Sequence, residues 1–402
     1  MANSGKFQWH PSSRLFAGKQ EIKRSAQAAT GFQAIAAQPS ALALSCLAAA
    51  IESGAGFCLY QKTLPDNIEA PAGTFLTLTG GTSGAPKIIR RSQNSWITSF
   101  AHNASSFGYM PSDAIAVFGA LSHSLALYGV VEAMHLGLHA HVLDGQSGAQ
   151  QRAQIIAARI SILYLTPSQL RLLCTGHARA NLPSVRLILC GGGAIDAQTR
   201  QTALKLCPNA RIHVFYGAAE ISFITISDDQ TPEGSVGKPY PGVEIKLAED
   251  GEVWVKSPYL FDNYATGTAP DTRWQDGFLT VGELGSLDGE GNLWLKGRKT
   301  RMVTVADQNV FPEEVEARIK DLKSVGGCAV LALPDNLRGH HLIAVLEGSE
   351  DTKLAQTVRQ VCIDTFGSLI APKSVLFQMN LPRLPSGKVD LKSLTNWVKE
   401  QL

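Results

Sequence analysis

Residues 76–92 read LTLTGGTSGAPKIIRRS, and this stretch decides how the rest of the chain is interpreted. Alternating β-formers over residues 74–78 run into a loop rich in glycine and hydroxyl groups, made of Thr79, Gly80, Gly81, Thr82, Ser83 and Gly84 and closed by Pro86 and Lys87. Glycines let backbone N–H groups approach a polyphosphate, hydroxyls donate further hydrogen bonds, and a lysine adds a cation. An ordinary P-loop has Ser or Thr directly after its lysine, whereas Ile88 stands there. The stretch therefore indicates either a plain turn between strands or a phosphate loop of another kind.

Short motifs further along the chain distinguish these two interpretations. GGGA (Gly191–Ala194) and YGAAE (Tyr216–Glu220) each follow a strand-like run, and DGFLTVGELG (276–285), GRKTR (297–301), VFPEEVE (310–316) and LPSGK (384–388) come after them in that order. Together with the loop they resemble the ordered motifs of the adenylate-forming superfamily, which includes acyl- and aryl-CoA synthetases, peptide-synthetase adenylation domains and luciferases. The resemblance covers roughly residues 75–388, and on it the chain is identified as a member of that superfamily.

The composition fits a cytoplasmic protein with two domains. The 402 residues are enough for two hydrophobic cores, and the net charge of +2 is spread along the chain, which argues against a nucleic-acid-binding face. Seven cysteines show no Cys-x-x-Cys pair, as expected for reduced thiols in a cytosol. The polar N-terminus lacks the apolar core of a signal peptide, and the apolar stretch Ala41–Ile51 is too short to span a membrane.

The pattern of strands and helices predicts an α/β fold. Strand-like and helix-like runs alternate between residues 114 and 190, which is typical of βαβ units and of a largely parallel sheet that binds ligands at the carboxyl ends of its strands. Short strands and turns follow from about Gly234, and a compact α+β segment follows Gly297. We expect a large N-terminal domain, residues 1–297, with layered βαβ sheets and a β-rich subdomain. A small α+β lid, residues 298–402, would follow it and move.

The position of the loop differs from the family. It begins near Thr79, whereas in full-length members of the superfamily it lies much further into the chain. We therefore expect an N-terminal domain that is truncated at its N-terminus, with a hydrophobic flank to be covered by residues 1–66 or by another subunit. A homodimer is the preferred explanation.

The resemblance implies that the chain makes acyl adenylates from ATP. Attack of a carboxylate on the α-phosphorus gives an adenylate whose AMP leaves readily, and cations and N–H donors must meet the charge on the phosphate oxygens. By the resemblance, the loop residues Thr79 to Gly84 and Lys87 bind the β- and γ-phosphates, and Glu220 holds Mg²⁺, a hard cation that prefers carboxylate and phosphate oxygens. The adenine would be bracketed by two segments, made of Gly192, Gly193 and Ala194 and of Tyr216, Gly217, Ala218 and Ala219.

Three more residues are assigned by the resemblance. Glu283 stands where the family has an Asp that accepts hydrogen bonds from the ribose hydroxyls, and Arg298 adds a contact to the ribose or a phosphate. Lys388 would reach the α-phosphate and the substrate carboxylate. Glu283 keeps the charge of that Asp on an arm longer by one methylene, and Lys388 in a Ser-Gly-Lys turn would usually be a surface residue, but its place within a matching motif favours the site.

The segment after His123 bears on the identity of the acid. His123 matches a family histidine beside the acyl pocket, although a lone histidine next to an apolar helix is also compatible with a core position. Amino-acid-activating relatives place an Asp close to this point to pair with the substrate ammonium, whereas residues 124–127 read SLAL and carry no charge. Together with Ala219 and the Gly-Gly start of the loop, this favours an aryl or other neutral carboxylic acid, with a fatty acid second.

Two departures from the family pattern concern the acceptor of the acyl group. Thr300 stands where the family has an Asp or Lys hinge, and Asp307 replaces a glycine that lines the tunnel for pantetheine. An acidic side chain there would narrow the tunnel or repel the phosphates of CoA, which favours the phosphopantetheine arm of a carrier protein. The alternatives are an acyl-CoA synthetase that uses free CoA and a fatty acid, and a nucleotide-binding homologue without activity. Retention of both Glu220 and Lys388 argues against the last.

Overall fold

A nine-stranded sheet forms the centre of the molecule. The computed structural model describes residues 5–24, 29–61, 63–78, 87–176, 181–322, 324–384 and 388–402. The strand order is β13-β12-β11-β10-β9-β7-β8-β1-β2, and the strands are β1 (Leu15–Ala17), β2 (Gln20–Ile22), β7 (Ala114–Val117), β8 (His139–Val142), β9 (Ile162–Leu165), β10 (Leu187–Gly191), β11 (Arg211–Ala218), β12 (Ser222–Ser227) and β13 (Lys238–Pro239). From β1 to β11 neighbouring strands run parallel, while β2, β12 and β13 pair antiparallel at the edges. The predicted largely parallel sheet is confirmed.

A second sheet carries the glycine-rich segment. Its strand order is β16-β6-β5-β4-β3, with β3 (Gln33–Ala36), β4 (Phe57–Tyr60), β5 (Thr74–Leu78), β6 (Ile88–Ser92) and β16 (Asn263–Thr266). Strand β16 lies in the part of the sequence that we expected to form the β-rich subdomain, but it pairs antiparallel with β6. The later part of the chain thus returns to the strand that follows the glycine-rich loop.

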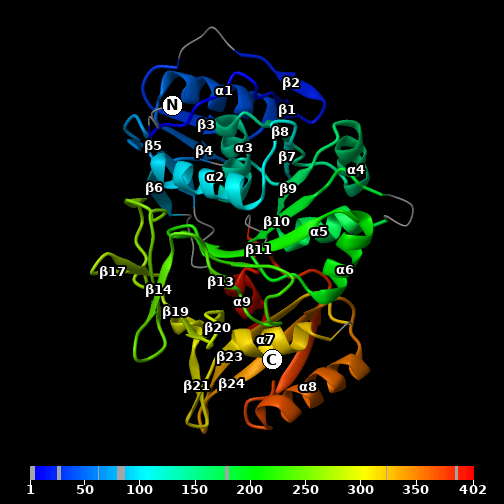
Figure 1. Cartoon of the computed structure of the whole chain (residues 1–402). Coiled ribbons are helices and arrows are strands. Elements are labelled where there is room, and N and C mark those ends of the chain that lie inside the picture. The colour runs from blue at the N-terminus through cyan, green and yellow to red at the C-terminus, as the bar shows by residue number, and fades with distance from the viewer. Residues whose placement is uncertain are drawn as a thin grey trace.

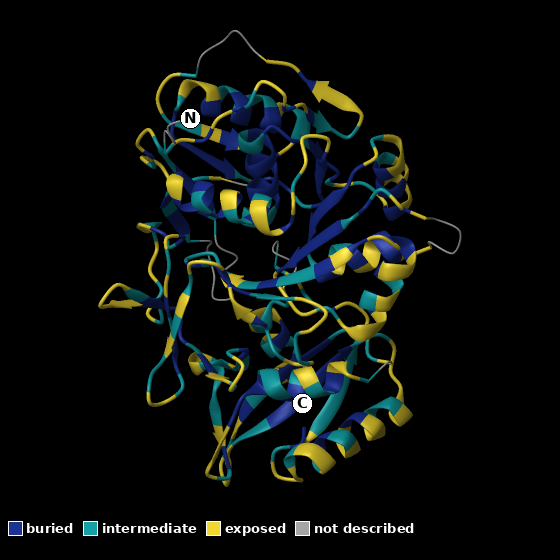
Figure 2. Ribbon diagram, in the orientation of Figure 1, coloured by how far each residue is buried: buried dark blue, intermediate teal, exposed yellow. Residues whose placement is uncertain are grey.

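Two hydrophobic cores lie on opposite faces of the nine-stranded sheet (Figures 1 and 2). Ile115 and Val117 of β7 face a core shared with α1 (Ser40–Ser53), α2 (Asn94–Ser106) and α3 (Ser124–Leu136). Ala114 and Ala116 face the other core, with α4 (Gly148–Ala157), α5 (Pro167–Cys174) and α6 (Ala197–Leu206). Successive residues of a strand point to opposite faces, so one strand of four buried residues supplies both cores.

The remainder of the chain forms smaller units. A four-stranded sheet has the order β14-β15-β18-β17 and a hairpin pairs β19 with β20; the strands are β14 (Glu244–Leu247), β15 (Val253–Lys256), β17 (Arg273–Gln275), β18 (Phe278–Thr280), β19 (Glu283–Leu287) and β20 (Leu293–Arg298). The 3-10 turn η1 (Lys299–Arg301) leads into a C-terminal α+β unit made of β21 (Val303–Val305), β22 (Gln308–Val310), α7 (Pro312–Lys320), β23 (Cys328–Asp335), β24 (Gly339–Glu347), α8 (Thr352–Phe366), β25 (Ser374–Gln378) and α9 (Leu391–Gln401). This unit has its own buried clusters. The boundary between residues 297 and 298 stays a prediction.

Local sequence signals explain some elements and miss others. The start of α5 has a clear local signal, since Thr166 and Gln169 form a reciprocal capping box around Pro167. Helix α2 was not predicted, and the residue before it, Gln93, makes no side-chain cap. The segment from Tyr216 to Ala218, expected to be a turn, continues strand β11. No described helix combines the length and hydropathy that a membrane span requires; a cytoplasmic location stays a prediction.

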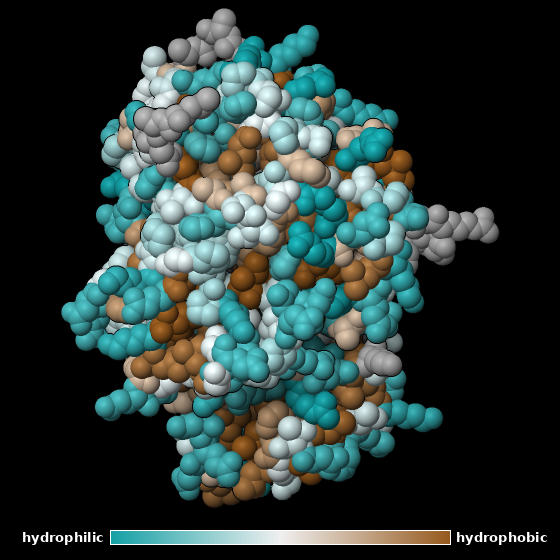
Figure 3. Space-filling view, in the orientation of Figure 1, coloured by the Kyte–Doolittle hydropathy of each residue, from teal (hydrophilic) through white to brown (hydrophobic). Residues whose placement is uncertain are grey.

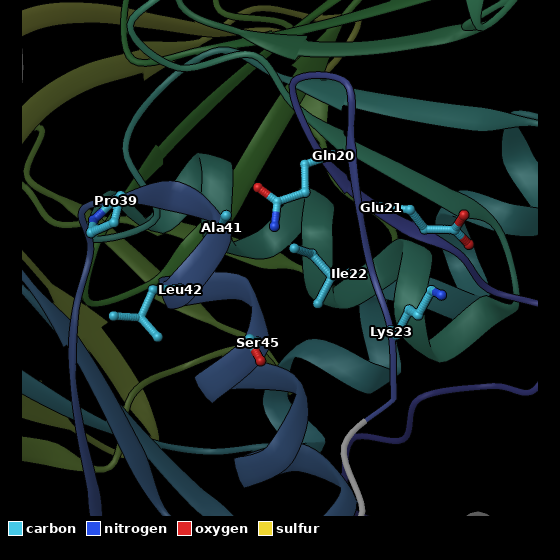
Figure 4. A pocket seen from close by; sticks show the side chains of 8 residues that line it. All are labelled: Gln20, Glu21, Ile22, Lys23, Pro39, Ala41, Leu42 and Ser45. Carbon is cyan, nitrogen blue, oxygen red and sulfur yellow. The ribbon is translucent and has the colours of Figure 1, made fainter.

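A groove of about 460 Å³ lies between β2 and the start of α1 (Figure 4). Leu42 of α1 is 57% exposed there. Strand β2 is short, carries the exposed charge of Glu21 and is followed by the exposed Lys23, features that discourage an edge strand from pairing with another chain. On the face seen in Figure 3, brown apolar side chains are interrupted by teal polar ones. The homodimer stays a prediction.

A buried carboxyl group on α3, that of Glu132, connects several elements through hydrogen bonds. Glu132 is fully buried, and its carboxyl accepts hydrogen bonds from Asn103 of α2 at 2.7 Å, Tyr164 of β9 at 2.7 Å and Tyr109 at 3.3 Å. Tyr240 donates to Asn103 Oδ1 at 2.6 Å and extends the network. Burial raises the pKa of Glu132 to about 7, although the hydrogen bonds oppose this shift.

This pKa makes the stability of the folded chain depend on pH. A folded-state pKa above that of the unfolded chain stabilises the fold at low pH, and the stabilisation is lost as pH rises from about 4.5 to about 7. We expect Glu132→Gln to be destabilising at pH 4.5 and to gain on the natural protein by up to about 3 kcal/mol by pH 8. Urea unfolding at several pH values measures this. A difference between the two proteins that does not change with pH would contradict it.

Candidate active site

The predicted phosphate loop connects β5 to β6, and residues 79–86 lie outside the described residues. The predictions for Thr79, Gly80, Gly81, Thr82, Ser83 and Gly84 therefore stay predictions. Lys87, at the end of the loop, is described. Its ammonium lies 5.9 Å from the ring centroid of Tyr264 on β16, within the range in which a cation is attracted to an aromatic face. The return of β16 to β6 thus places an aromatic ring beside the loop lysine.

Glu220 lies in the turn between β11 and β12 and is held by the same tyrosine. Tyr264 donates its hydroxyl to Glu220 Oε1 at 2.7 Å, and the Glu220 carbonyl accepts the N–H of Phe261 at 2.9 Å. Tyr264 therefore contacts both the predicted metal ligand and the predicted phosphate-binding lysine. The sequence offered no motif for this role.

Close packing fixes the backbone from Tyr216 to Ala219. A Cβ at Gly217 would lie 1.9 Å from the carbonyl oxygen of Ser222, so only glycine fits where β11 meets β12. Arg91 of β6 is 1% exposed and donates to the carbonyls of Ala219 and of Tyr259. Burial lowers the pKa of Arg91 to about 10, while the charges of Glu220 and Asp262 oppose that shift. A buried cation therefore holds the segment that ends in Glu220.

The second predicted adenine segment follows the neighbouring strand. Strands β10 and β11 are parallel, with Gly191 opposite Phe215, so both segments leave the same edge of the sheet, where parallel α/β sheets bind ligands. Gly192 has φ +89°, a conformation that favours glycine. Cβ atoms at Gly192 and Gly193 would lie 3.8 and 3.6 Å from Thr166 and Pro167, at the start of α5. Ala194 follows directly.

Glu283 and Arg298 face each other across the β19–β20 hairpin. The Arg298 Nε lies 3.5 Å from Glu283 Oε1. The other carboxylate oxygen, Oε2, is buried and has no hydrogen-bond partner among the described residues. Burial raises the pKa of Glu283, while the charges of Arg298 and Lys388 oppose the shift. An unpartnered buried acceptor is costly unless a ligand satisfies it, and a pair of ribose hydroxyls would do so.

Lys388 of the C-terminal unit extends into this group of charges. It retains exposed surface, yet desolvation by the surrounding protein and the charge of Arg298 lower its pKa, whereas Glu283 and Glu220 oppose the shift. The preceding residues 385–387 lie outside the described residues. The fold therefore brings together four of the predicted residues from distant parts of the chain: Glu220, Glu283, Arg298 and Lys388.

His123 immediately precedes α3 and has an extended backbone, with φ −91° and ψ 130°. Burial lowers its pKa by disfavouring the charged imidazolium, and the charge of Asp144 opposes the shift. On the same helix, Leu125 approaches Gly191, where a Cβ would lie 3.5 Å from the leucine methyl. The start of α3 therefore lies beside the predicted adenine segment, and the role of His123 stays a prediction.

The described residues suit a nucleoside triphosphate and a divalent cation. The Tyr216 hydroxyl, like Glu283 Oε2, is buried without a partner among the described residues. Glu220 and Lys87 add a carboxylate and a cation on either side of Tyr264, the donor types that Mg²⁺ and phosphate oxygens prefer. The part of the chain that the structure describes holds no group of three or more His, Cys, Asp or Glu residues that could bind a metal ion.

Comparison with known families identifies the class of protein. The family model described as AMP-binding enzyme matches residues 19–265, and that of the AMP-binding enzyme C-terminal domain matches residues 314–388. The chain belongs to this adenylate-forming family and is an AMP-forming ligase.

Two relatives in sequence are named as CoA ligases. An uncharacterized acyl–CoA ligase, YhfT of Bacillus subtilis, is 30% identical over 341 residues, which cover 82% of this chain and 69% of the relative. The 2-succinylbenzoate–CoA ligase of Listeria monocytogenes is 26% identical over 329 residues, 79% of this chain and 68% of the relative.

Solved structures confirm the two-domain adenylate-forming fold. The o-succinylbenzoate CoA synthetase of Bacillus subtilis, in complex with its acyl adenylate, superposes with a TM-score of 0.79 at 19% identity, covering 94% of each chain. The amide bond synthetase McbA of Marinactinospora thermotolerans superposes with a TM-score of 0.74 at 21% identity, covering 92% of this chain and 90% of that one.

Proposed function

We propose that this ligase activates an aryl or other neutral carboxylic acid as its adenylate and then transfers the acyl group to a phosphopantetheine thiol. The observation that carries the proposal is the pair of Glu283 and Arg298, 3.5 Å apart, with a buried and unpartnered Glu283 oxygen; the charges of Arg298, Glu283 and Glu220 also act on the Lys388 ammonium. In this arrangement the lid residue meets the nucleotide site, as adenylation requires. Residues 298–402 would act as the mobile lid of a domain that ends at residue 297.

Each residue has one task in the adenylation step. Glu283 accepts the ribose hydroxyls with its free oxygen, and Tyr216 and Gly192–Ala194 bracket the adenine. Bound Mg²⁺ would neutralise the phosphates, with Glu220 as its protein ligand and Lys87 beside them. Lys388 brings a cation to the α-phosphate and to the attacking carboxylate, where charge develops.

Several features support an aryl or small neutral acid. Residues 124–127 carry no charge that could pair with an ammonium. Several relatives are named for 2-succinylbenzoate, an aryl acid. Others are named putative long chain fatty acid–CoA ligases, which keeps a fatty acid as the alternative.

Exchange of pyrophosphate into ATP across a panel of acids tests the choice of acid. We expect exchange that requires Mg²⁺, with aryl acids ahead of α-amino acids by at least about tenfold, since residues 124–127 offer no carboxylate to pair with a desolvated ammonium. Long-chain fatty acids serve as a third arm. Best exchange with an amino acid would contradict the proposal, and best exchange with a fatty acid would favour the alternative.

The turn between β21 and β22 supports a carrier protein as acceptor. Ala306 and Asp307 have φ values of +47° and +64°, so two residues with side chains occupy positions that favour glycine. Asp307 is exposed. The Ala306 N–H donates to the carbonyl of Arg338 at 2.9 Å, and the neighbouring Leu337 is 95% exposed. An exposed leucine and arginine beside the turn offer contacts to an acidic carrier, whereas the relatives' names favour CoA.

Substitution of Asp307 separates the two acceptors. We expect Asp307→Gly to raise turnover with free CoA by about three- to tenfold and to change transfer to a carrier little, because it removes both bulk and a charge that repels the CoA phosphates. The gain should be larger at low salt, where repulsion is less screened. Steady-state kinetics with CoA and with a carrier measure the effect.

Asp307→Asn is the matched variant, because asparagine tolerates a positive φ and removes only the charge. A gain in both variants assigns the effect to repulsion, and a gain in the glycine variant alone assigns it to bulk. The carrier proposal is wrong if the natural enzyme uses CoA as fast as its best carrier, or if neither substitution changes CoA use.

A further inference from the structure

The linker between the body and the C-terminal unit is held by charges on both sides of one residue. Lys299 donates its N–H to the Gly282 carbonyl at 2.8 Å, and its ammonium lies 2.6 Å from Asp250 Oδ2 and 3.9 Å from Glu252 Oε2. Two residues later, Arg301 pairs with Glu313 at 3.3 Å and Glu316 at 2.8 Å. Thr300, between them, is exposed. Lys299 is thus bound to the body and Arg301 to the C-terminal unit.

Glu252 is the buried centre of the body-side contacts. Its side chain is only 4% exposed, and it accepts hydrogen bonds from Arg273 and, at 3.2 Å, from Thr280 Oγ1. A pocket of about 250 Å³ adjoins these groups and is lined by Glu252, Pro270, Asp271, Arg273, Gly282 and Lys299. A buried carboxylate needs compensating cations. Lys299 is one of the two that reach it.

The same cluster contacts the backbone next to the predicted nucleotide site. The Gly282 N–H approaches Thr280 Oγ1 at 3.1 Å, and Gly282 precedes Glu283, the predicted ribose ligand. Because Lys299 bonds to the Gly282 carbonyl, one turn of backbone connects the ribose ligand to the linker. No part of the predicted adenylation chemistry uses Asp250, Glu252 or Lys299.

We propose that Asp250 and Glu252, acting through Lys299, hold the body end of the linker so that lid rotation is confined to Thr300 and Lys388 is kept in the arrangement that forms the adenylate. Lys299 is therefore a positioning residue. The proposal rests on the proposed function, since it assumes that Lys388 serves adenylation and leaves afterwards. If the Lys299 contacts are lost, the linker can also rotate at residue 299, and the arrangement of the lid that forms the adenylate becomes less populated.

Lys299→Met tests this, because methionine keeps most of the side-chain length and removes the charge. Exposed ion pairs shift equilibria only modestly, so we expect adenylation to fall by about three- to tenfold, while acyl transfer from a supplied adenylate stays unchanged or rises. Asp250→Asn should act in the same direction. Lys246→Met is the control: Lys246 is an exposed lysine of β14 in the same subdomain, and its ammonium lies over the Phe278 ring.

Hydrogen exchange of the linker gives a readout that does not need turnover. The Lys299 amide, bonded to Gly282, should exchange several-fold faster in Lys299→Met than in the natural protein and unchanged in Lys246→Met. An equal loss in both half-reactions, or an unchanged exchange rate of the Lys299 amide, would overturn the proposal that Lys299 holds the linker. If the natural protein adenylates no acid, the proposed function fails, and the exchange measurement still decides whether Lys299 holds the linker.

Discussion

Lys388→Ala is expected to abolish most adenylate formation while leaving the second half-reaction intact. Removal of a cation that meets the reacting phosphate should cost about 2–4 kcal/mol of transition-state stabilisation, roughly 10²–10³ in rate. Transfer of the acyl group from a supplied adenylate should change little, because the lid rotates about the linker after adenylation and carries Lys388 out of the site. Pyrophosphate exchange and single-turnover thioester formation measure the two steps separately.

Lys392→Ala is the matched control, since Lys392 is an exposed lysine in the first turn of α9, four residues along the same segment. It should leave both steps unchanged. An equal loss of both half-reactions in Lys388→Ala would contradict the alternation of the lid, and full retention of adenylation would remove Lys388 from the site.

Glu220→Gln is expected to lower adenylation by roughly 10²–10³ and to raise the Mg²⁺ concentration needed for half-maximal rate. A metal ion contributes several kcal/mol by neutralising charge on phosphoryl oxygens, and an amide oxygen is a weaker ligand for a hard cation than a carboxylate. Glutamine keeps an acceptor for the Tyr264 hydroxyl, so the turn should retain its structure. A titration of rate against Mg²⁺ measures the change.

Tyr264→Phe distinguishes the binding of the metal by Glu220 from the support that the Tyr264 hydroxyl gives to Glu220. It removes the hydroxyl that donates to Glu220 but keeps the ring beside Lys87, so it should lower the rate by about tenfold at most. If Glu220→Gln shows the same dependence on Mg²⁺ as the natural protein, Glu220 does not hold the metal.

The sequence predicted those parts of the fold whose signals are local. The alternation of strands and helices between residues 114 and 190 predicted the parallel sheet, and the start of α5 carries its capping chemistry within one turn of sequence. Helix α2 lacks such a cap and was missed. The antiparallel pairing of β16 with β6 joins residues that lie far apart in the chain, and no local pattern encodes it.

In the candidate site, too, local motifs predicted some residues, whereas others were apparent only from the fold. Its motifs located Glu220, Glu283, Arg298 and Lys388, and the fold brings these four together. Tyr264, Arg91 and Lys299 were missed, although each contacts a predicted residue or its neighbour. Their roles arise from the return of β16, the burial of a charged residue on β6, and the approach of Asp250 to the linker. A buried arginine within a strand was the one signal that could have indicated a supporting role, since such a charge requires partners.

The central claim is that the carboxylate of the acid attacks the α-phosphorus of ATP. Reaction of an aryl acid labelled with ¹⁸O in its carboxylate, followed by phosphorus NMR of the products, tests it most directly. The account predicts that the AMP released with the acyl product carries one labelled oxygen and that the pyrophosphate carries none. Until the acyl group is transferred to a thiol or to water, the labelled oxygen stays in the acyl adenylate and no labelled AMP is released. Label in inorganic phosphate with formation of ADP would contradict it.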